Sequence, residues 1–290
     1  MSISFRPLRL STVLVTAVAV VCWAFLLVLP GVCRAAPRSC SAILYNLSTG
    51  RILWQKNAGA SIPPASLTKV MTMYLALDRV RAGKLSLKRQ IRIPAQAVAV
   101  GGSTMHLRSG EKVPLDQLLT GMAVASGNDA AMTVAMAVGP NLRSFVRQMN
   151  ARARALGMRQ TSFKNPTGLP AAGQKTSARD MLTLCRAYLA AHPSALRYHS
   201  TRYFRHGRRG LGNTNPLLGS IKGVDGLKTG WTQASGYNII VTAQRGKTRL
   251  MAIVLGCKTR PVRDALAHDM IETGFRWPAS SQKVREQLGR

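Results

Sequence analysis

The stretch Ile62-Pro-Pro-Ala-Ser-Leu-Thr-Lys-Val-Met-Thr72 joins a helix-breaking segment to a predicted helix. The two prolines disfavour the helical conformation in the residues before them. Beyond them, apolar residues recur every three or four positions, which predicts a helix over 66–80. Positions i and i+3 share one face of a helix, so the Ser66 hydroxyl and the Lys69 amine are predicted to lie side by side.

A hydroxyl beside an amine can attack a carbonyl carbon. Serine is a poor nucleophile until a neighbouring group takes its proton. Lysine can take that proton when burial and nearby positive charge lower its pKa towards neutrality. The start of the helix also leaves backbone N–H groups unpaired near Ser66. Taken alone, however, the pair Ser66 and Lys69 is more typical of a capping serine and an exposed lysine.

Ser126-Gly-Asn128 follows an apolar helix predicted over 115–124. The Ser126 hydroxyl could relay a proton between Lys69 and a leaving amine, and Asn128 could hold a substrate amide. Alone, the segment is typical of a plain turn. Asp129 is predicted to cap the following helix.

Lys228-Thr-Gly230 falls on a strand predicted over 225–230. Lys228 and Thr229 could bind a carboxylate, while Gly230 would let a peptide backbone lie close to the strand. Taken alone, the segment is also typical of an exposed basic strand end.

The rest of the chain predicts an α+β fold. Two strands at the start of the chain and three near its end are expected to form one antiparallel sheet of five strands, with helices on its faces and a mostly helical region inserted between. The strands are predicted at 40–46, 51–55, 225–230, 237–244 and 249–256. The remaining helices are predicted at 115–124, 130–138, 142–156, 178–190 and 262–275.

The N-terminal stretch predicts export. Arg6 and Arg9 precede an apolar run over 13–28, and small residues follow at Ala35 and Ala36, which is the layout of a secretory signal. An uncleaved membrane anchor stays open, because spanning a bilayer takes about 17–25 residues. The expected organisation is therefore a signal or anchor over 1–35, a catalytic domain over 38–277 and a short basic tail over 278–290. The protein is predicted to be periplasmic or at the cell surface.

The charge is strongly positive, with 41 Lys and Arg against 10 Asp and Glu and a net charge of +31. Such a field attracts polyanions. Because export argues against nucleic acid, anionic wall or membrane polymers are the expected partners. The basic stretch over 202–209 motivates this prediction, although a solvated loop is the preferred interpretation of that stretch.

Cysteine and histidine usage predicts no metal site and no cofactor. Cys40, Cys185 and Cys257 lie beyond the signal, without any Cys or His spacing typical of a metal ligand set. One disulfide with one free thiol is an option, but buried apolar cysteines are the preferred interpretation.

Taken together, the three motifs favour a catalytic function over the simpler interpretation of each one. Ser66 with Lys69, Ser126 with Asn128, and Lys228-Thr-Gly230 reproduce, in order, the signature of penicillin-recognising serine enzymes. From about Ser41 to Phe275 the chain resembles the low-molecular-mass D-Ala-D-Ala carboxypeptidases, serine peptidases with a β-lactamase-like fold. Further blocks that resemble this family are Gly101-Gly-Ser-Thr-Met105, Asn165-Pro-Thr-Gly-Leu169, Thr176-Ser-Ala-Arg-Asp-Met181 and Gly236-Tyr-Asn238.

The resemblance implies an acyl-enzyme mechanism on peptidoglycan stem peptides. Ser66 would attack the penultimate D-alanine carbonyl, Lys69 would take its proton, and Ser126 would protonate the departing D-alanine. The implied substrate-binding residues are Asn128, Lys228, Thr229, Gly230 and Trp231. The backbone N–H groups of Ser66 and Trp231 would form the oxyanion hole, and β-lactam antibiotics would be covalent inhibitors.

Larger members of that family carry a β-rich C-terminal domain and an amphipathic membrane helix, and this chain is expected to have neither. Three other functions are compatible with parts of the sequence. A D,D-endopeptidase that cuts cross-links would use the same residues. A β-lactamase is less favoured, because the middle third shows no E-x-x-x-N segment. A non-catalytic wall-binding protein is disfavoured by the intact Ser66.

Overall fold

Five antiparallel strands in the order β2-β1-β9-β8-β7 form the central sheet of the computed structural model, which describes residue 2 and residues 40–289. The strands are β1 (Ser41–Asn46), β2 (Arg51–Lys56), β7 (Val224–Thr232), β8 (Gly236–Arg245) and β9 (Thr248–Cys257). The five-stranded sheet predicted from the sequence is thus confirmed.

The two ends of the described chain meet in this sheet. Strand β1 pairs with β9 from Ser41 opposite Leu255 to Asn46 opposite Leu250. A disulfide between Cys40 and Cys257 closes the same end of the pair, whereas Cys185 is a buried free thiol. The preference for three buried thiols was therefore wrong, because strand pairing brings two distant cysteines within 4.7 Å between their Cα atoms.

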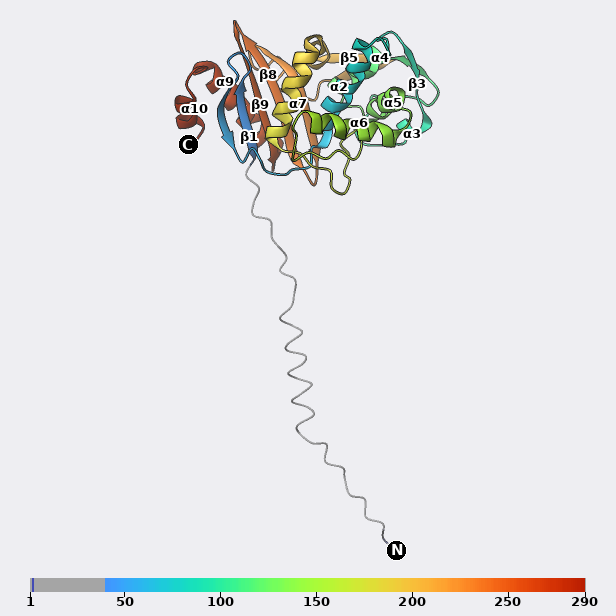
Figure 1. Ribbon diagram of the computed structural model, residues 1–290, viewed down its shortest axis with the longest axis horizontal. Coiled ribbons are helices and arrows are strands. Elements are labelled where there is room, and N and C mark those ends of the chain that lie inside the picture. Colours follow the sequence, from blue (N-terminus) through green and yellow to red (C-terminus); the bar gives the residue numbers. More distant parts are fainter. Residues whose placement is uncertain (1, 3–39, 290) are drawn as a thin grey trace. The chain divides into compact units, whose positions relative to one another are not determined.

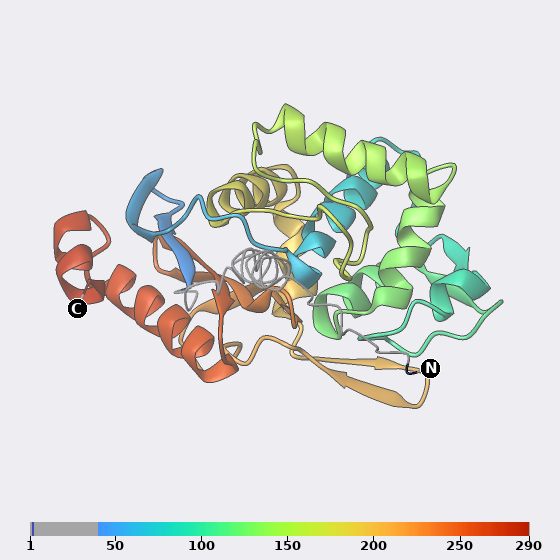
Figure 2. The ribbon, with the colours of Figure 1, turned by 90° about the horizontal axis from the view of Figure 1, so that it is seen from below.

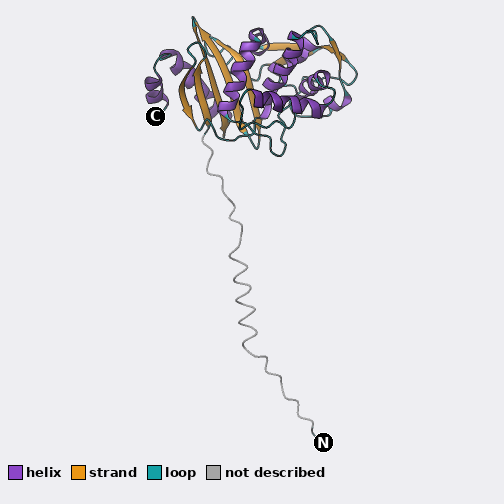
Figure 3. Cartoon of the chain, viewed as in Figure 1, coloured by secondary structure: helices purple, strands orange, loops and turns teal. Residues whose placement is uncertain are grey.

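Helices flank the sheet, and two small two-stranded sheets lie apart from it (Figures 1 and 3). The helices are η1 (Ala65–Leu67), α2 (Thr68–Arg81), α3 (Ala95–Val98), α4 (Leu115–Val124), α5 (Asn128–Val138), α6 (Leu142–Ala155), α7 (Ala178–Ala191), η2 (Pro193–Ala195), α8 (Leu196–Ser200), α9 (Arg260–Arg276) and α10 (Ser281–Leu288). The small sheets pair β3 (Gln90–Arg92) with β4 (Lys112–Pro114), and β5 (Tyr203–His206) with β6 (Arg209–Gly212).

Each face of the sheet packs against its own core, because side chains alternate along a strand. On β9, Met251 and Ile253 belong to the core shared with the inserted helices. Leu250 and Ala252 belong to the core beneath α9 and α10. Figure 1 shows α9 and α10 on one face of the sheet and α7 on the other.

Helix α2 positions the candidate site. Its residues from Thr68 to Leu77 are all buried, as expected of a helix that is surrounded by other elements on every side. Figure 2 shows α2, in cyan, between the sheet and the inserted helices. The polar side chains at the start of this helix are consequently carried into the interior.

Three local features differ from the prediction. The turn at Ser66 is a 3₁₀ helix, η1, and the α-helix begins only at Thr68. The basic stretch forms the hairpin of β5 and β6 instead of a loop, because its residues pair from Tyr203 to Gly212. Residues 281–288 form α10, which buries Val284 in the core beneath the sheet.

The predicted signal or anchor, with its apolar run over 13–28, lies outside the described residues. Within the described part of the chain, every helix is too short or too polar to cross a bilayer.

Candidate active site

Ser66 and Lys69 are in direct contact where η1 runs into α2. The Lys69 amine donates to the Ser66 hydroxyl at 2.9 Å, to Oδ1 of Asn128 at 2.7 Å and to the carbonyl of Thr167 at 2.7 Å. The Lys69 side chain is fully buried, whereas Ser66 is partly open to solvent. The predicted hydroxyl–amine pair is thus present, with the amine held by three partners.

The surroundings of Lys69 favour its neutral form. Burial lowers the pKa of this amine well below its usual value, and the positive charge of Lys228 lowers the pKa further, against an opposing effect of Asp129. A neutral amine has a free lone pair. At 2.9 Å from the hydroxyl it can therefore accept the Ser66 proton.

The loop over 165–169 packs against Ser66 and Lys69. The Asn165 side chain accepts from the backbone N–H groups of Thr167 and Gly168 at 3.2 and 2.7 Å. Gly168 has a φ of +86°, and a Cβ there would lie 1.8 Å from the carbonyl oxygen of Ala65. Only glycine allows the loop to pack this closely against the turn that carries Ser66.

Ser126 and Asn128 lie at the junction of α4 and α5. Ser126 is 4% exposed and has a φ of +60°. The amide of Asn128 is engaged at both ends, because its oxygen accepts from Lys69 and its Nδ2 donates to the carbonyl of Gly101 at 2.8 Å. Asn128 therefore holds the lysine amine here, and its role towards a substrate amide stays a prediction.

Asp129 does not cap the helix as predicted. Its carboxylate accepts from the backbone N–H groups of Met105 and Leu107 at 3.0 and 3.1 Å. The prediction was wrong because Gly127 takes the cap position. The Asp129 carboxylate accepts from the backbone N–H of Ala130 in the first turn at 2.8 Å, and it also fixes a loop that is distant in sequence. That loop includes Ser103, whose carbonyl accepts from the backbone N–H of Asn128 at 2.7 Å.

Strand β7 brings the Lys228-Thr-Gly230 segment against η1. A Cβ at Gly230 would lie 2.9 Å from the backbone nitrogen of Ser66, so the missing side chain permits this close approach. Thr229 donates from its hydroxyl to that of Thr214 at 2.7 Å. The strand therefore forms a wall beside the nucleophile candidate.

Lys228 is a second buried amine. It is 1% exposed and donates to the carbonyl of Thr229 at 2.9 Å. Burial, together with the positive charge of Arg263, lowers its pKa to about 7. The site consequently combines several positive centres, which favours an anionic group on a bound molecule.

His199 supports β7 from the side away from solvent. Its Nδ1 lies 2.8 Å from the carbonyl oxygen of Leu227 and its Nε2 lies 3.1 Å from the Tyr188 hydroxyl. Burial lowers the pKa of His199 to about 3, so the ring is neutral and donates one hydrogen bond to the strand. His199 therefore positions Leu227, the residue that precedes Lys228 on β7.

A cavity of about 290 Å³ joins these parts. Its lining residues are Ser66, Ser103, Ser126, Thr214, Thr229, Gly230, Trp231, Tyr237, Arg260 and Arg263. Of the residues predicted from the sequence, five line the cavity, while Lys69, Asn128 and Lys228 lie behind its wall. Trp231 is 56% exposed, and its ring centroid lies 5.8 Å from that of Tyr237.

The other five lining residues were not predicted as site residues: Ser103, Thr214, Tyr237, Arg260 and Arg263. Arg260 and Arg263 are one helical turn apart on α9, which the sequence presents as an ordinary basic helix start. Only the fold shows that Arg263 is 3% exposed and that its guanidinium also donates to Asp264 at 2.8 Å. The residues described by the structure contain no cluster of His, Cys, Asp and Glu suited to a metal ion.

Comparison with known proteins agrees with this geometry. A family model described as D-alanyl-D-alanine carboxypeptidase matches residues 32–259. D-alanyl-D-alanine carboxypeptidase DacF of Bacillus subtilis is 37% identical over 240 residues, which are 81% of this chain and 61% of that protein. DacC of Escherichia coli is 36% identical over 242 residues, with 81% and 60% covered. The chain thus spans about three fifths of the length of these curated relatives.

A solved structure extends the similarity to the fold. The crystal structure of penicillin-binding protein D2 from Listeria monocytogenes in its ampicillin-bound form superposes with a TM-score of 0.74 at 32% identity. The superposition covers 81% of this chain and 96% of that one. The matched family model, the shared fold and the contact between Ser66 and Lys69 agree with one another. This chain belongs to the D-alanyl-D-alanine carboxypeptidase family of peptidases.

Proposed function

We propose that the protein is a serine-type D-Ala-D-Ala carboxypeptidase that removes the terminal D-alanine from peptidoglycan stem peptides. The observation that carries this proposal is the 2.9 Å contact between the Lys69 amine and the Ser66 hydroxyl in a site where burial lowers the pKa of the amine. Membership of the carboxypeptidase family supports the choice of substrate.

The reaction would pass through an ester on Ser66. The Ser66 oxygen attacks the carbonyl carbon of the penultimate D-alanine as its proton moves to Lys69. The bond to the nitrogen of the terminal D-alanine then breaks, and that nitrogen receives a proton by way of Ser126. Water hydrolyses the ester and releases the shortened peptide. Ser126 suits the relay because it is nearly buried and lines the same cavity as Ser66.

Backbone N–H groups of Ser66 and Trp231 would hold the oxyanion. The close approach of Gly230 to the Ser66 nitrogen supports this assignment, because it places the two segments side by side. One such donor is typically worth about 2.7–4 kcal/mol of transition-state stabilisation.

The terminal carboxylate of the substrate would bind between β7 and α9. Thr229 supplies a hydroxyl to the cavity, Lys228 supplies positive charge from behind it, and Arg263 adds a buried guanidinium. Arginine is well suited to carboxylates because its fork of N–H groups matches their two oxygens. Arg263 thus joins the substrate-binding residues inferred from the sequence.

The direct test is intact-mass measurement after exposure to benzylpenicillin. We expect the native protein to gain one covalent adduct, because the lactam carbonyl would take the place of the peptide carbonyl. The variant Ser66→Ala should gain none. An adduct on Ser66→Ala, or none on the native protein, would contradict the assignment of Ser66.

The endopeptidase alternative shares every residue of the site and differs only in substrate. Purified muropeptides separate the two activities. The carboxypeptidase removes one alanine from a pentapeptide monomer, whereas an endopeptidase converts dimers into monomers. Rapid turnover of the penicillin ester would instead favour a β-lactamase.

We also propose that the enzyme acts outside the cytoplasm and is retained there by anionic polymers. The N-terminal secretory layout and the net charge of +31 support this location and these partners. Attraction between exposed charges is screened beyond about 8 Å at physiological ionic strength. Retention on isolated cell walls should therefore weaken as salt is raised, and retention that ignores salt would argue against an electrostatic association.

A further inference from the structure

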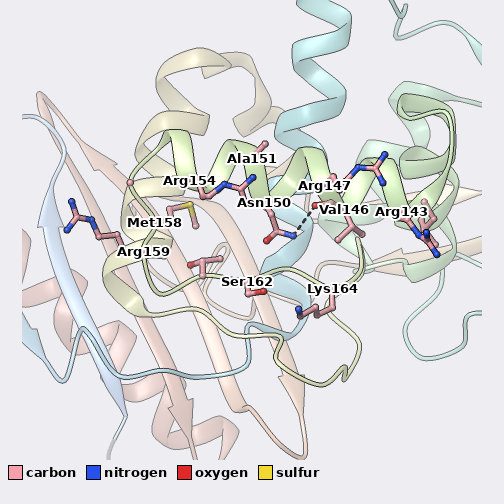
Figure 4. Close-up of a pocket in the computed structure, with 13 residues that line it drawn as sticks. Arg143, Val146, Arg147, Asn150, Ala151, Arg154, Met158, Arg159, Ser162 and Lys164 are labelled. Carbon is pink, nitrogen blue, oxygen red and sulfur yellow. Dashed lines mark hydrogen bonds between the residues drawn. The ribbon is translucent and has the colours of Figure 1, made fainter.

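A groove of about 1110 Å³ lies along α6 and shares no lining residue with the Ser66 cavity. Helix α6 forms one side of the groove and the segment over 157–164 forms the other (Figure 4). We call this surface the α6 groove. Its lining residues are Leu142, Arg143, Val146, Arg147, Asn150, Ala151, Arg154, Gly157, Met158, Arg159, Thr161, Ser162 and Lys164.

The α6 groove is cationic without local neutralisation. Its charged lining residues are Arg143, Arg147, Arg154, Arg159 and Lys164, and none is acidic. All five are exposed, and none forms an ion pair with another residue of the described range. The nearby Asp180 is buried and accepts hydrogen bonds from the Gln160 backbone and the Thr161 hydroxyl. The groove therefore attracts anions.

The spacing of the cations suits a linear ligand. Arg143, Arg147 and Arg154 follow one another on α6 at intervals of four and seven residues. With a rise of about 1.5 Å per residue, these intervals correspond to roughly 6 and 10 Å along the helix axis. A row of positive charges in a concave surface fits a chain with repeated anionic groups better than a flat bilayer, which cannot enter a groove.

The α6 groove is joined to the proposed active site through a short segment. Lys164 lines the groove, and Thr167, three residues later, accepts a hydrogen bond from the Lys69 amine. An extended chain spans at most about 3.3–3.6 Å per residue, so the two backbones lie within roughly 11 Å of each other. The α6 groove therefore lies close in space to the residue that binds the Lys69 amine.

We propose that the α6 groove binds a second stretch of peptidoglycan, by the carboxylates of stem peptides that neighbour the one at Ser66. This inference rests on the proposed function, because that function supplies a polymer with a carboxylate on every stem peptide. Guanidinium groups bind carboxylates through paired N–H donors. The groove would thus hold the polymer near the enzyme while successive peptides reach Ser66.

Two matched variants test the proposal. The groove variant carries R143Q, R147Q and R154Q. The control variant carries R205Q, R208Q and R209Q in the β5–β6 hairpin, which removes three positive charges from another exposed surface. Each protein is sedimented with insoluble peptidoglycan that has been freed of attached polymers, at low and at high salt. We expect the groove variant to bind about tenfold more weakly at low salt, and the control to change less than about twofold.

Kinetics provide a second readout that a merely structural effect would not imitate. The groove variant should show a raised KM for polymeric peptidoglycan, with kcat and the KM for a soluble pentapeptide unchanged. Its acylation by benzylpenicillin should also match that of the native protein. If benzylpenicillin does not acylate the native protein, the proposed function is contradicted. If it does, but binding to peptidoglycan does not depend on the α6 groove, only this inference is contradicted.

Three results would overturn the proposal. Equal weakening of both variants would show that net charge, and not the α6 groove, governs binding. Unchanged binding of the groove variant would exclude the groove altogether. Groove-dependent binding to anionic lipid vesicles or to a phosphodiester polymer, without binding to stripped peptidoglycan, would assign the groove to a different partner.

Discussion

At the scale of single residues, the site depends on two lysines in the protein interior. Burial disfavours a charged amine, so each lysine either stays neutral or needs close partners. Lys69 and Lys228 are both fully or almost fully buried, and the charge of Lys228 lowers the pKa of Lys69. Lys69 can therefore act as the proton acceptor, while Lys228 supplies a positive charge.

We expect the rate constant for acylation by benzylpenicillin to pass through a maximum as pH rises. Protonated Lys69 cannot accept the Ser66 proton, so the rate climbs as pH passes the lowered pKa of Lys69. Lys228 must be charged to attract the penicillin carboxylate, and its pKa of about 7 means that this attraction weakens above about pH 7. Stopped-flow or mass-spectrometric rates across the pH range measure both limbs.

The variant Lys228→Gln identifies the two limbs. Loss of its positive charge raises the pKa of Lys69, so the rising limb should move to higher pH and the falling limb should disappear. Lys222→Gln, at an exposed position nearby in sequence, is the matched control and should leave the profile in place. A rising limb that does not move in Lys228→Gln would contradict the coupling between the two lysines.

At the scale of elements, the junction of α4 and α5 organises the site. It carries Ser126 in a left-handed conformation, then Asn128 against Lys69, then Asp129 against the loop over 101–107. Ser126 thus lines the cavity, while Asn128 and Asp129 hold α2 and the loop beside it. The junction connects α2 to the loop that contributes Ser103.

Replacement of Asp129 by alanine should destabilise the connection between the α4–α5 junction and the loop over 101–107. The backbone N–H groups of Met105 and Leu107 would lose a charged acceptor, and such hydrogen bonds are worth roughly 1.5–3 kcal/mol. Urea denaturation should show a lower free energy of unfolding by about that amount, and acylation should slow because Ser103 is no longer fixed. Asp269→Ala, at a carboxylate that is 64% exposed, should change stability little. Equal stability of the two variants would contradict the role given to Asp129.

Prediction from the sequence succeeded where the signal is local. Helix α4 begins at Leu115 and ends at Val124 as predicted, because an apolar repeat lies between Pro114 and a turn-forming segment. It failed for Asp129, because its partners Met105 and Leu107 lie more than twenty residues earlier in the chain. It also missed Arg263, because burial of a charged side chain depends on elements that meet only in the folded protein.

At the scale of the whole molecule, the Cys40–Cys257 disulfide ties together the start and the end of the sheet, which are 217 residues apart in sequence. Cross-linking restricts the unfolded chain more strongly when the closed loop is long. The variant C40S/C257S should therefore unfold at a lower temperature, with a loss of about 2–5 kcal/mol.

The folded variant should still be acylated by benzylpenicillin, because neither cysteine lines the Ser66 cavity. Differential scanning calorimetry with and without reductant measures the change in stability. The native protein should respond to reductant and the variant should not. Equal unfolding temperatures for the two proteins would show that strand pairing alone holds β1 and β9 together.

The pairing of β1 with β9 also restricts the order in which the molecule can be completed. A ribosome delivers Ser41–Asn46 early and Thr248–Cys257 about two hundred residues later. Until then β1 has only its hairpin partner β2, and an isolated hairpin is at best marginally stable in water. The central sheet therefore cannot be completed until the last strands emerge. This order is compatible with passage of the unfolded chain through a narrow channel before the sheet forms.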